Sequence, residues 1–135
     1  MATKVLDSWA LMAFFNDEPS AGEVEKLLFK AAEDKHQLLL SVINWGEIYY
    51  AVMRVDSQEA AEQKAKEIAS LPIALVPVAD DLELVRQAAV YKATKKMSYA
   101  DCFAAALAKV KNAELVTGDT EFKEVEKEIK INWLL

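Results

Sequence analysis

Apolar residues along the chain form two patterns, short unbroken runs and longer stretches with helical spacing. Unbroken apolar runs of this length predict buried strands. They occupy residues 4–6, 37–41, 72–76, 114–117 and 129–133. Between them, apolar positions recur every three or four residues, as at Val24, Leu27 and Ala31, and this spacing predicts helices. The helices are expected at residues 8–16, 23–33, 42–54, 57–70, 80–95, 98–111 and 121–127.

Strands separated by helices predict a parallel sheet with helices on both faces. Most of the strand runs are continuous rather than alternating, as expected when both faces of a sheet are covered. The chain has only three Gly and three Pro, and tight hairpins need these residues, so an all-β fold is disfavoured. With 135 residues and no repeat, linker or low-complexity segment, the sequence predicts one α/β domain over residues 1–135.

Net charge narrows the classes of function. The chain carries 22 Asp and Glu against 16 Lys and Arg, which gives a net charge of −6. This balance argues against a protein that binds nucleic acid by covering phosphates with a basic face. It is compatible with an enzyme that reaches phosphates through a metal ion.

The chain has one Cys (Cys102) and one His (His36). A single Cys forms no intrachain disulfide, which is typical of intracellular proteins, and no apolar run approaches the ~18 residues of a membrane span; we therefore expect a cytoplasmic protein. One Cys and one His cannot build a zinc site from soft ligands. We interpret the charged stretch 33–36 as a solvent-exposed helix end, so carboxylates are the expected reactive groups.

Two carboxylates follow predicted strands. Asp7 comes directly after the strand at 4–6, and Asp119 follows the strand at 114–117. In an open α/β sheet, ligands bind outside the carboxyl ends of the strands, at the point where the strand order reverses. The two side chains are therefore expected to converge.

Two further carboxylates stand alone on apolar helices. Glu47 is the only charged residue within 42–52, and Asp101 is the only one within 97–108. Burying an isolated carboxylate is unfavourable unless it is paired, protonated or bound to a metal. These two acids are therefore candidates for a site rather than for a solvated surface.

Each of the four acids also has a structural interpretation as part of a helix cap. The caps would be formed by Asp7, by Asp119, and by the capping boxes Ser98-x-x-Asp101 and Asn44-x-x-Glu47. All four acids nevertheless fall at one predicted edge of the sheet, where they would repel one another without a cation. Because all the donors are oxygens, the expected cation is Mg²⁺ or Mn²⁺.

Four segments around these acids resemble the acidic motifs of PIN-domain ribonucleases. They are Val5-Leu6-Asp7-Ser8, Asn44-x-x-Glu47, Ser98-Tyr99-Ala100-Asp101 and Val116-Thr117-Gly118-Asp119-Thr120-Glu121-Phe122. The match covers essentially the whole chain, and the short form of the chain is similar to VapC-type toxins of type II toxin–antitoxin pairs. The resemblance implies a three-layer α/β/α PIN-like fold, in which a parallel sheet of about five strands in the order 3-2-1-4-5 is flanked by about seven helices.

The resemblance also implies the residues of the site. The acids implied to be catalytic and to hold one or two Mg²⁺ or Mn²⁺ ions are Asp7, Glu47, Asp101 and Asp119. Ser8 and Thr117 are implied as supporting contacts. Glu121 is either a further acid near the metal or a first-turn helix acid with no catalytic role.

The implied activity is that of a metal-dependent endoribonuclease, with the chain as the toxin of a toxin–antitoxin pair. The implied partners are an RNA substrate, a cognate antitoxin and a second copy of the chain in a homodimer. Because no histidine pair is available to activate a 2′-hydroxyl, we expect water to be the nucleophile and the products to carry 5′-phosphate and 3′-hydroxyl ends. Two other functions stay open: a nuclease of RNA processing or quality control, and a non-catalytic phosphoacceptor or interaction domain.

A few basic and aromatic residues are candidates for contact with RNA. The basic candidates are Lys92, Lys95, Lys96 and Arg54. Lysines at a helix C-terminus also suit the helix dipole, which is the structural alternative. Trp9 and Tyr99 could stack on unpaired bases, and Trp9 stands where a small residue is common in the family.

A set of apolar residues on the predicted helix 42–54 exceeds what one contact with a sheet requires. The set consists of Trp45, Ile48, Tyr49 and Val52. These residues either pack in the core or form an exposed protein-binding face.

Overall fold

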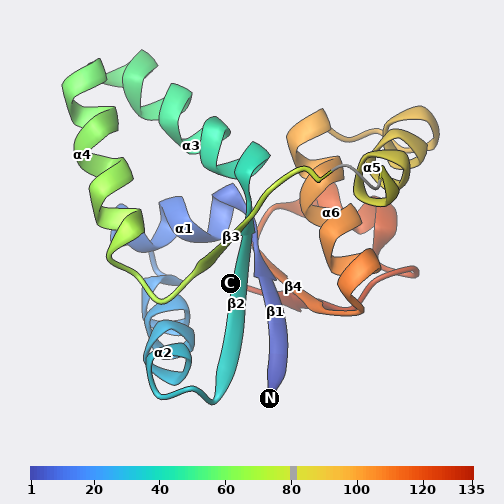
Figure 1. Ribbon diagram of the computed structural model, residues 1–135, viewed down its shortest axis with the longest axis horizontal. Coiled ribbons are helices and arrows are strands. Elements are labelled where there is room, and N and C mark those ends of the chain that lie inside the picture. Colours follow the sequence, from blue (N-terminus) through green and yellow to red (C-terminus); the bar gives the residue numbers. More distant parts are fainter. Residues whose placement is uncertain (80–81) are drawn as a thin grey trace.

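The computed structural model of the protein describes residues 1–79 and 82–135, which form a three-layer α/β/α arrangement (Figure 1). Its elements follow in the order β1 (Ala2–Leu6), α1 (Ser8–Phe15), α2 (Ala21–Ala32), β2 (His36–Ser41), α3 (Val42–Val55), α4 (Gln58–Ala69), β3 (Ala74–Val76), α5 (Glu83–Thr94), α6 (Tyr99–Lys111), β4 (Glu114–Thr117), η1 (Thr120–Val125) and β5 (Ile131–Trp133). The start predicted for the helix at 80–95 lies outside the described residues.

One parallel sheet contains the five described strands, in the order β3-β2-β1-β4-β5. This confirms the topology that the resemblance implied. The strand order reverses between β1 and β4, so the carboxyl ends of these two central strands form the switch point of the sheet. Leu6 is in register with Val116, and the residues that follow β1 and β4 therefore emerge side by side.

Two hydrophobic cores lie on opposite faces of the sheet. Consecutive residues of a strand point to opposite sides, so Val5 packs with residues of α5, α6 and η1, whereas Leu6 packs with residues of α1, α2 and α3. Figure 1 shows the same division, with α1 to α4 on one side of the sheet and α5 and α6 on the other. Both faces are covered, as the unbroken apolar runs predicted.

Several elements differ from the prediction in length or type. Pro72 has no backbone N–H, and the N–H of Ile73 bonds back to the carbonyl of Leu71, so β3 is shorter than predicted. The helix predicted at 121–127 is the 3₁₀ helix η1, a form that proteins use in short connecting pieces.

The interpretation of His36 as part of a helix end is wrong, because this residue begins β2 and is in register with Ala2 of β1. None of the described helices is long and apolar enough to cross a membrane.

Candidate metal and active site

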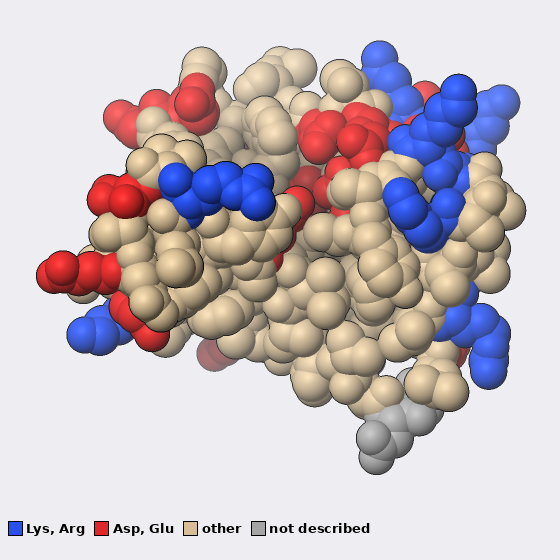
Figure 2. All heavy atoms as spheres, turned by 90° about the horizontal axis from the view of Figure 1, so that it is seen from above, with Lys and Arg blue, Asp and Glu red and all other residues tan. Residues whose placement is uncertain are grey.

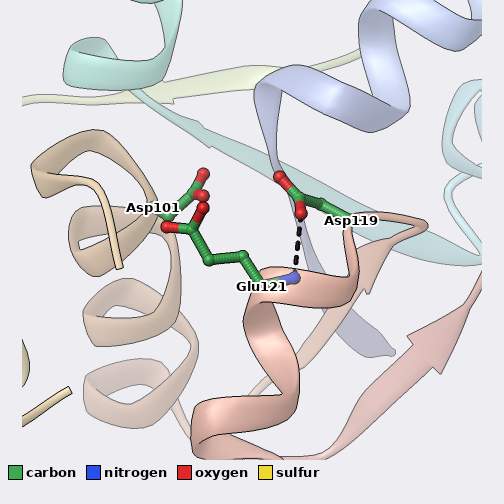
Figure 3. Close-up of side chains that lie close together, drawn as sticks. All are labelled: Asp101, Asp119 and Glu121. Atoms are coloured by element: carbon green, nitrogen blue, oxygen red, sulfur yellow. Dashed lines mark hydrogen bonds between the residues drawn. The ribbon is translucent and has the colours of Figure 1, made fainter. Parts of the chain in front are cut away.

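Three carboxylates meet at the carboxyl edge of the sheet. One oxygen each of Asp101, Asp119 and Glu121 lie within 4.8 Å of one another. Figure 3 shows the three side chains directed toward the same space, Asp101 from α6 and the other two from the segment that follows β4. Seen from above, acidic side chains gather in a hollow of this face (Figure 2). The geometry therefore brings Glu121 into the cluster with two of the four predicted acids.

Asp101 is left free by the way in which α6 begins. Ser98 caps the helix, and its hydroxyl accepts a hydrogen bond from the backbone N–H of Asp101 at 3.2 Å. The backbone N–H of Ser98 donates to the carboxylate of Glu121. The bond from the Asp101 N–H to Ser98 is the half of the predicted capping box that forms, whereas Glu121 takes the place of Asp101 in the other half. The carboxylate of Asp101, a residue that is only 7% exposed, is therefore available to the cluster.

Asp7 lies beside this cluster in a network centred on Thr117. The Thr117 hydroxyl donates to Asp7 Oδ2 at 2.6 Å and accepts from the backbone N–H of Asp119 at 3.0 Å. The second carboxylate oxygen of Asp7 accepts from the N–H of Ala10 at 2.9 Å and so caps α1. The predicted cap is present, and it holds the carboxylate in place at the site.

Asp119 also has both roles. Its Oδ1 accepts from the backbone N–H of Glu121 at 2.9 Å, which caps η1 and is the dashed line in Figure 3. The cap fixes the direction in which Glu121 leaves the chain. The two capping interactions at the carboxyl ends of β1 and β4 thus orient the acids of the site.

Glu47 and Asn44 have different environments from the one predicted. Ser41 caps α3, since its hydroxyl accepts from the N–H of Ile43 at 3.1 Å, so the capping box Asn44-x-x-Glu47 is wrong. Glu47 is half-buried, and its Oε1 is buried without a hydrogen-bond partner among the described residues. Glu47 is close enough to the other acids for its charge to raise the pKa of Asp101. Its Oε1 is therefore an unsatisfied acceptor near the cluster.

Asn44 was missed as a positioning residue. Asn44 is fully buried, and its side-chain amide donates to the backbone carbonyl of Ala100 at 3.2 Å. The backbone carbonyl of Asn44 accepts from the Ser8 hydroxyl at 3.1 Å. These bonds join α1, α3 and α6; the supporting role of Ser8 stays a prediction. A polar residue within an otherwise apolar helix was the available signal.

Two acids of the site have raised pKa values. Burial raises the pKa of Asp7 to about 7; hydrogen bonds from Thr117 and Ala10 oppose the rise, and the charges of Asp119 and Glu47 add to it. Burial, and after it the charges of the neighbouring carboxylates, raise the pKa of Asp101 to about 8. The five carboxylates thus form one electrostatic unit.

The donor set fits a divalent cation. The ion pairs seen among the described residues involve none of the five acids, so no Lys or Arg neutralises them. The ligands are carboxylate oxygens, the donors that Mg²⁺ and Mn²⁺ prefer. The unpartnered Oε1 of Glu47 and the raised pKa values indicate a site that is incomplete without positive charge.

Three of the four basic candidates have contacts with residues outside the acidic cluster. Lys92 donates to the carbonyl of Met97 at 2.9 Å, and Lys95 pairs with Glu128 at 3.1 Å. Arg54 lies over the ring of Tyr50, 5.3 Å from its centroid. Figure 2 shows a group of basic side chains next to the acidic hollow, on the side of α5. Their contact with RNA remains a prediction.

Most of the apolar set on α3 packs inside the molecule. Ile48 is buried, Trp45 and Val52 pack against the core, and Trp45 stacks on Tyr49 with ring centroids 5.5 Å apart. The structure therefore favours the core interpretation of this set.

The structure thus defines an α/β domain with a cluster of carboxylates at the switch point of a five-stranded parallel sheet, the position at which ligands bind in such folds. A family model described as the PIN domain matches residues 4–128. The chain therefore belongs to the PIN domain family.

Solved structures share this fold along almost the whole chain. VapBC2 from Rickettsia felis, bound to a DNA fragment from its promoter, contains a chain with a TM-score of 0.74 at 17% identity, covering 98% of this chain and 99% of that one. DNA-bound VapBC from Salmonella typhimurium gives 0.72 at 17% identity, with 98% of each chain covered.

VapC20 from Mycobacterium tuberculosis, described as a sarcin-ricin loop cleaving toxin, gives a TM-score of 0.68 at 20% identity and covers 89% of this chain and 92% of that one. At these identities the likeness is one of fold. A comparison with curated protein sequences found no match.

Proposed function

We propose that this protein is a metal-dependent endoribonuclease and the toxin component of a type II toxin–antitoxin pair. The observation that carries the proposal is the meeting of Asp101, Asp119 and Glu121 within 4.8 Å at the switch point of a PIN domain. Asp7 and Glu47 extend this cluster, as the mutual effects on pKa indicate.

The acids have distinct tasks in this proposal. Asp7, Glu47, Asp101 and Asp119 hold the Mg²⁺ or Mn²⁺ ion, and Glu121 contributes from η1 while its bond from Ser98 fixes it against α6. When bound, the cation supplies Lewis-acid activation of water and of the scissile phosphate. Thr117 holds the Asp7 carboxylate in one orientation by donating to Oδ2. Water attacks the phosphorus, the bond to the 3′-oxygen breaks and that oxygen leaves with a proton, so the products carry 5′-phosphate and 3′-hydroxyl ends.

Solved structures of the same fold support the proposal of an antitoxin and an RNA substrate, whereas the homodimer rests on the family resemblance alone. Two of them are VapBC complexes, in which toxin and antitoxin occur together, and a third is described as cleaving the sarcin-ricin loop. We propose an RNA substrate, a cognate antitoxin and a homodimer for this chain. The net charge of −6 favours an antitoxin segment with basic residues over the acidic site.

The test is cleavage of structured RNAs by the purified protein with Mn²⁺ or Mg²⁺, with mapping of the 5′ ends. The Asp101→Asn variant should lose about 100-fold or more of the rate, because it removes a charged oxygen ligand. Glu59→Gln, an exposed acid on α4, should cleave like the wild type. Unchanged activity of Asp101→Asn, or products ending in a 2′,3′-cyclic phosphate, would contradict the proposal.

A further inference from the structure

A cavity of about 530 Å³ lies next to the acidic site, between α1 and the end of β4. Its lining includes Trp9, Met12, Asn16, Ser20, Gly118 and Leu134. Cavities of this size are large enough for a small organic ligand. Glu18 is the one acid on its wall, and the five acids of the site do not line it, so the cavity is a separate compartment that the proposed hydrolysis does not use.

The cavity and the acids are built from the same two chain segments. Trp9 is two residues from Asp7, and Gly118 directly precedes Asp119. A Cβ atom at position 118 would collide with the six-membered ring of Trp9. The indole therefore rests against the Gly118 backbone, one residue from an acid of the site, and position 118 has to be glycine for the ring to lie there.

The cavity combines an aromatic wall with unsatisfied polar groups. Trp9 is 36% exposed, so part of its indole is open to a ligand. Ser20 is only 2% exposed, and its hydroxyl has no hydrogen-bond partner among the described residues. A buried hydroxyl without a hydrogen-bond partner is unfavourable unless a ligand or a water molecule supplies the missing bond. Asn16, a second polar residue, also lines the cavity.

We propose that this cavity is a base-binding subsite, which accepts one unpaired nucleobase of the RNA next to the phosphate that is cleaved. The inference rests on the proposed ribonuclease function. The base stacks on the indole of Trp9, and its edge bonds to the Ser20 hydroxyl and the Asn16 amide. Recognition of RNA sequence relies on unpaired bases that are stacked on aromatic side chains and read along their edges.

A nucleobase suits these features better than an apolar peptide side chain. An apolar group would cover the Ser20 hydroxyl without satisfying it, whereas every base offers donors and acceptors on its edge. The position one residue from Asp119 also matches a nucleotide whose phosphate is at the acids. The subsite is therefore expected to select the base beside the cleaved bond.

Photocrosslinking tests the subsite without relying on cleavage. Oligoribonucleotides with 4-thiouridine or 6-thioguanosine at single positions are irradiated with the Asp101→Asn variant, which keeps the RNA intact. We expect a crosslinked peptide that contains Trp9, Met12 or Ser20. Adding Trp9→Ala should lower the yield at least about 10-fold, and adding Phe29→Ala, an exposed aromatic on α2, should not. Crosslinks confined to other surfaces would overturn the inference.

Cleavage by otherwise wild-type protein gives the second readout. We expect a preference for one base beside the cut, which falls about 10- to 100-fold in Trp9→Ala and in Gly118→Ala. Trp9→Phe should keep most of the preference, because a smaller ring still stacks. Ser20→Ala should change which base is preferred beside the cut. Its effect on the cleavage rate of sequences that lack the preferred base should be smaller. Melting curves identify any variant that is unfolded. If Trp9→Ala is unfolded, Ser20→Ala decides, because an unchanged base preference in that variant would contradict the subsite.

The outcomes separate this inference from the proposed function. Cleavage of RNA with a base preference that Trp9→Ala leaves intact overturns the subsite and retains the nuclease. Crosslinks in the cavity without metal-dependent cleavage support the subsite and overturn hydrolysis. If Trp9→Ala instead weakens only the binding of the purified antitoxin, the cavity is a protein-binding site and the inference is wrong.

Discussion

The carboxylates at the two ends of strands β1 and β4 have opposite electrostatic environments. Near the amino end, Glu114 of β4 is in register with Lys4 of β1, and the two side chains form an ion pair at 2.7 Å. At the carboxyl end, the same two strands lead into Asp7 and Asp119, which meet other acids and no cationic side chain among the described residues. The sheet thus places a neutralised acid at one end and an unneutralised group of acids at the other.

The difference teaches where function is located in this fold. An ion pair such as that of Lys4 and Glu114 stabilises the sheet modestly and needs nothing further. Crowded acids with raised pKa values destabilise the metal-free protein, and such groups concentrate at functional sites. The following predictions test this contrast, from the largest expected effect to the smallest.

Replacing Asp7 by Asn should reduce metal-dependent RNA cleavage about 100-fold or more, because the charged ligand is lost. Asn can still cap α1 through its single side-chain oxygen, and the amide nitrogen that replaces Oδ2 can donate to the Thr117 hydroxyl, so the fold should persist. Glu114→Gln, the acid at the opposite end of the same strands, is the matched control and should retain full activity. Initial rates and circular dichroism check both expectations, and equal activity in the two variants would remove the contrast between the ends.

Replacing Thr117 by Val should weaken Mn²⁺ binding and cleavage about 10-fold, as is typical when a group that orients a ligand is removed. The hydroxyl donates to Asp7, and this bond lowers the pKa of that carboxyl, so its loss should raise the pKa. The binding curve against pH should therefore move to higher pH. Thr94→Val, whose hydroxyl donates to a carbonyl within α5, is the control. An unshifted pH curve would show that the hydroxyl does not act through Asp7.

The metal-free protein should lose stability as the pH rises. The pKa of Asp7 is about 7 and that of Asp101 about 8, both above the value of about 3.9 in an unfolded chain. The folded state therefore binds more protons than the unfolded state in this range. The stabilisation is complete below about pH 4 and is lost as the pH rises through about 7 to 8.

Asp101→Asn cannot titrate at this position, so the comparison with the wild type isolates that carboxyl. In EDTA, the Tm of the variant should exceed that of the wild type by on the order of 5–10 °C at pH 8, and the gap should shrink toward pH 4. Mn²⁺ should raise the Tm of the wild type more at pH 8 than at pH 5, because protons compete for the ligands. A gap independent of pH would mean that Asp101 is not held at a raised pKa.

The smallest effect is expected at the amino end. Glu114→Gln removes the charge that pairs with Lys4, and the free energy of unfolding should fall by about 1 kcal/mol or less. This decrease in the free energy of unfolding should become smaller as NaCl is added, since salt screens the ion pair. Chemical denaturation at two salt concentrations measures this. A destabilisation as large as the effects at the acidic site would show that the pair is more than a surface contact.

Much of the fold was predictable because each strand has an unbroken apolar run and each acid has a distinctive position. Asp7 and Asp119 were identified because they follow strands, and Glu47 and Asp101 because they are isolated charges on apolar helices. The strand order came from the family resemblance, and the structure confirms it.

The remaining features depend on contacts between segments far apart in sequence. Whether Ser98 caps α6 and also binds Glu121 depends on where η1 packs. Asn44 bonds across to Ala100, which no local pattern indicates. The packing of Trp9 on Gly118 needs both strands in place. Local propensity carries no information on such pairs, so the sequence alone left these positions open.

The bond from Thr117 to Asp7 joins residues 110 positions apart. Contacts of such long range form late, since a long loop must close before they are made. During synthesis, the segment with Asp7 leaves the ribosome long before β4 is available to pair with it. A partly made chain consequently has the Asp7 carboxylate without the other acids of the site. The acidic site of this nuclease is therefore not assembled until translation has passed Asp119.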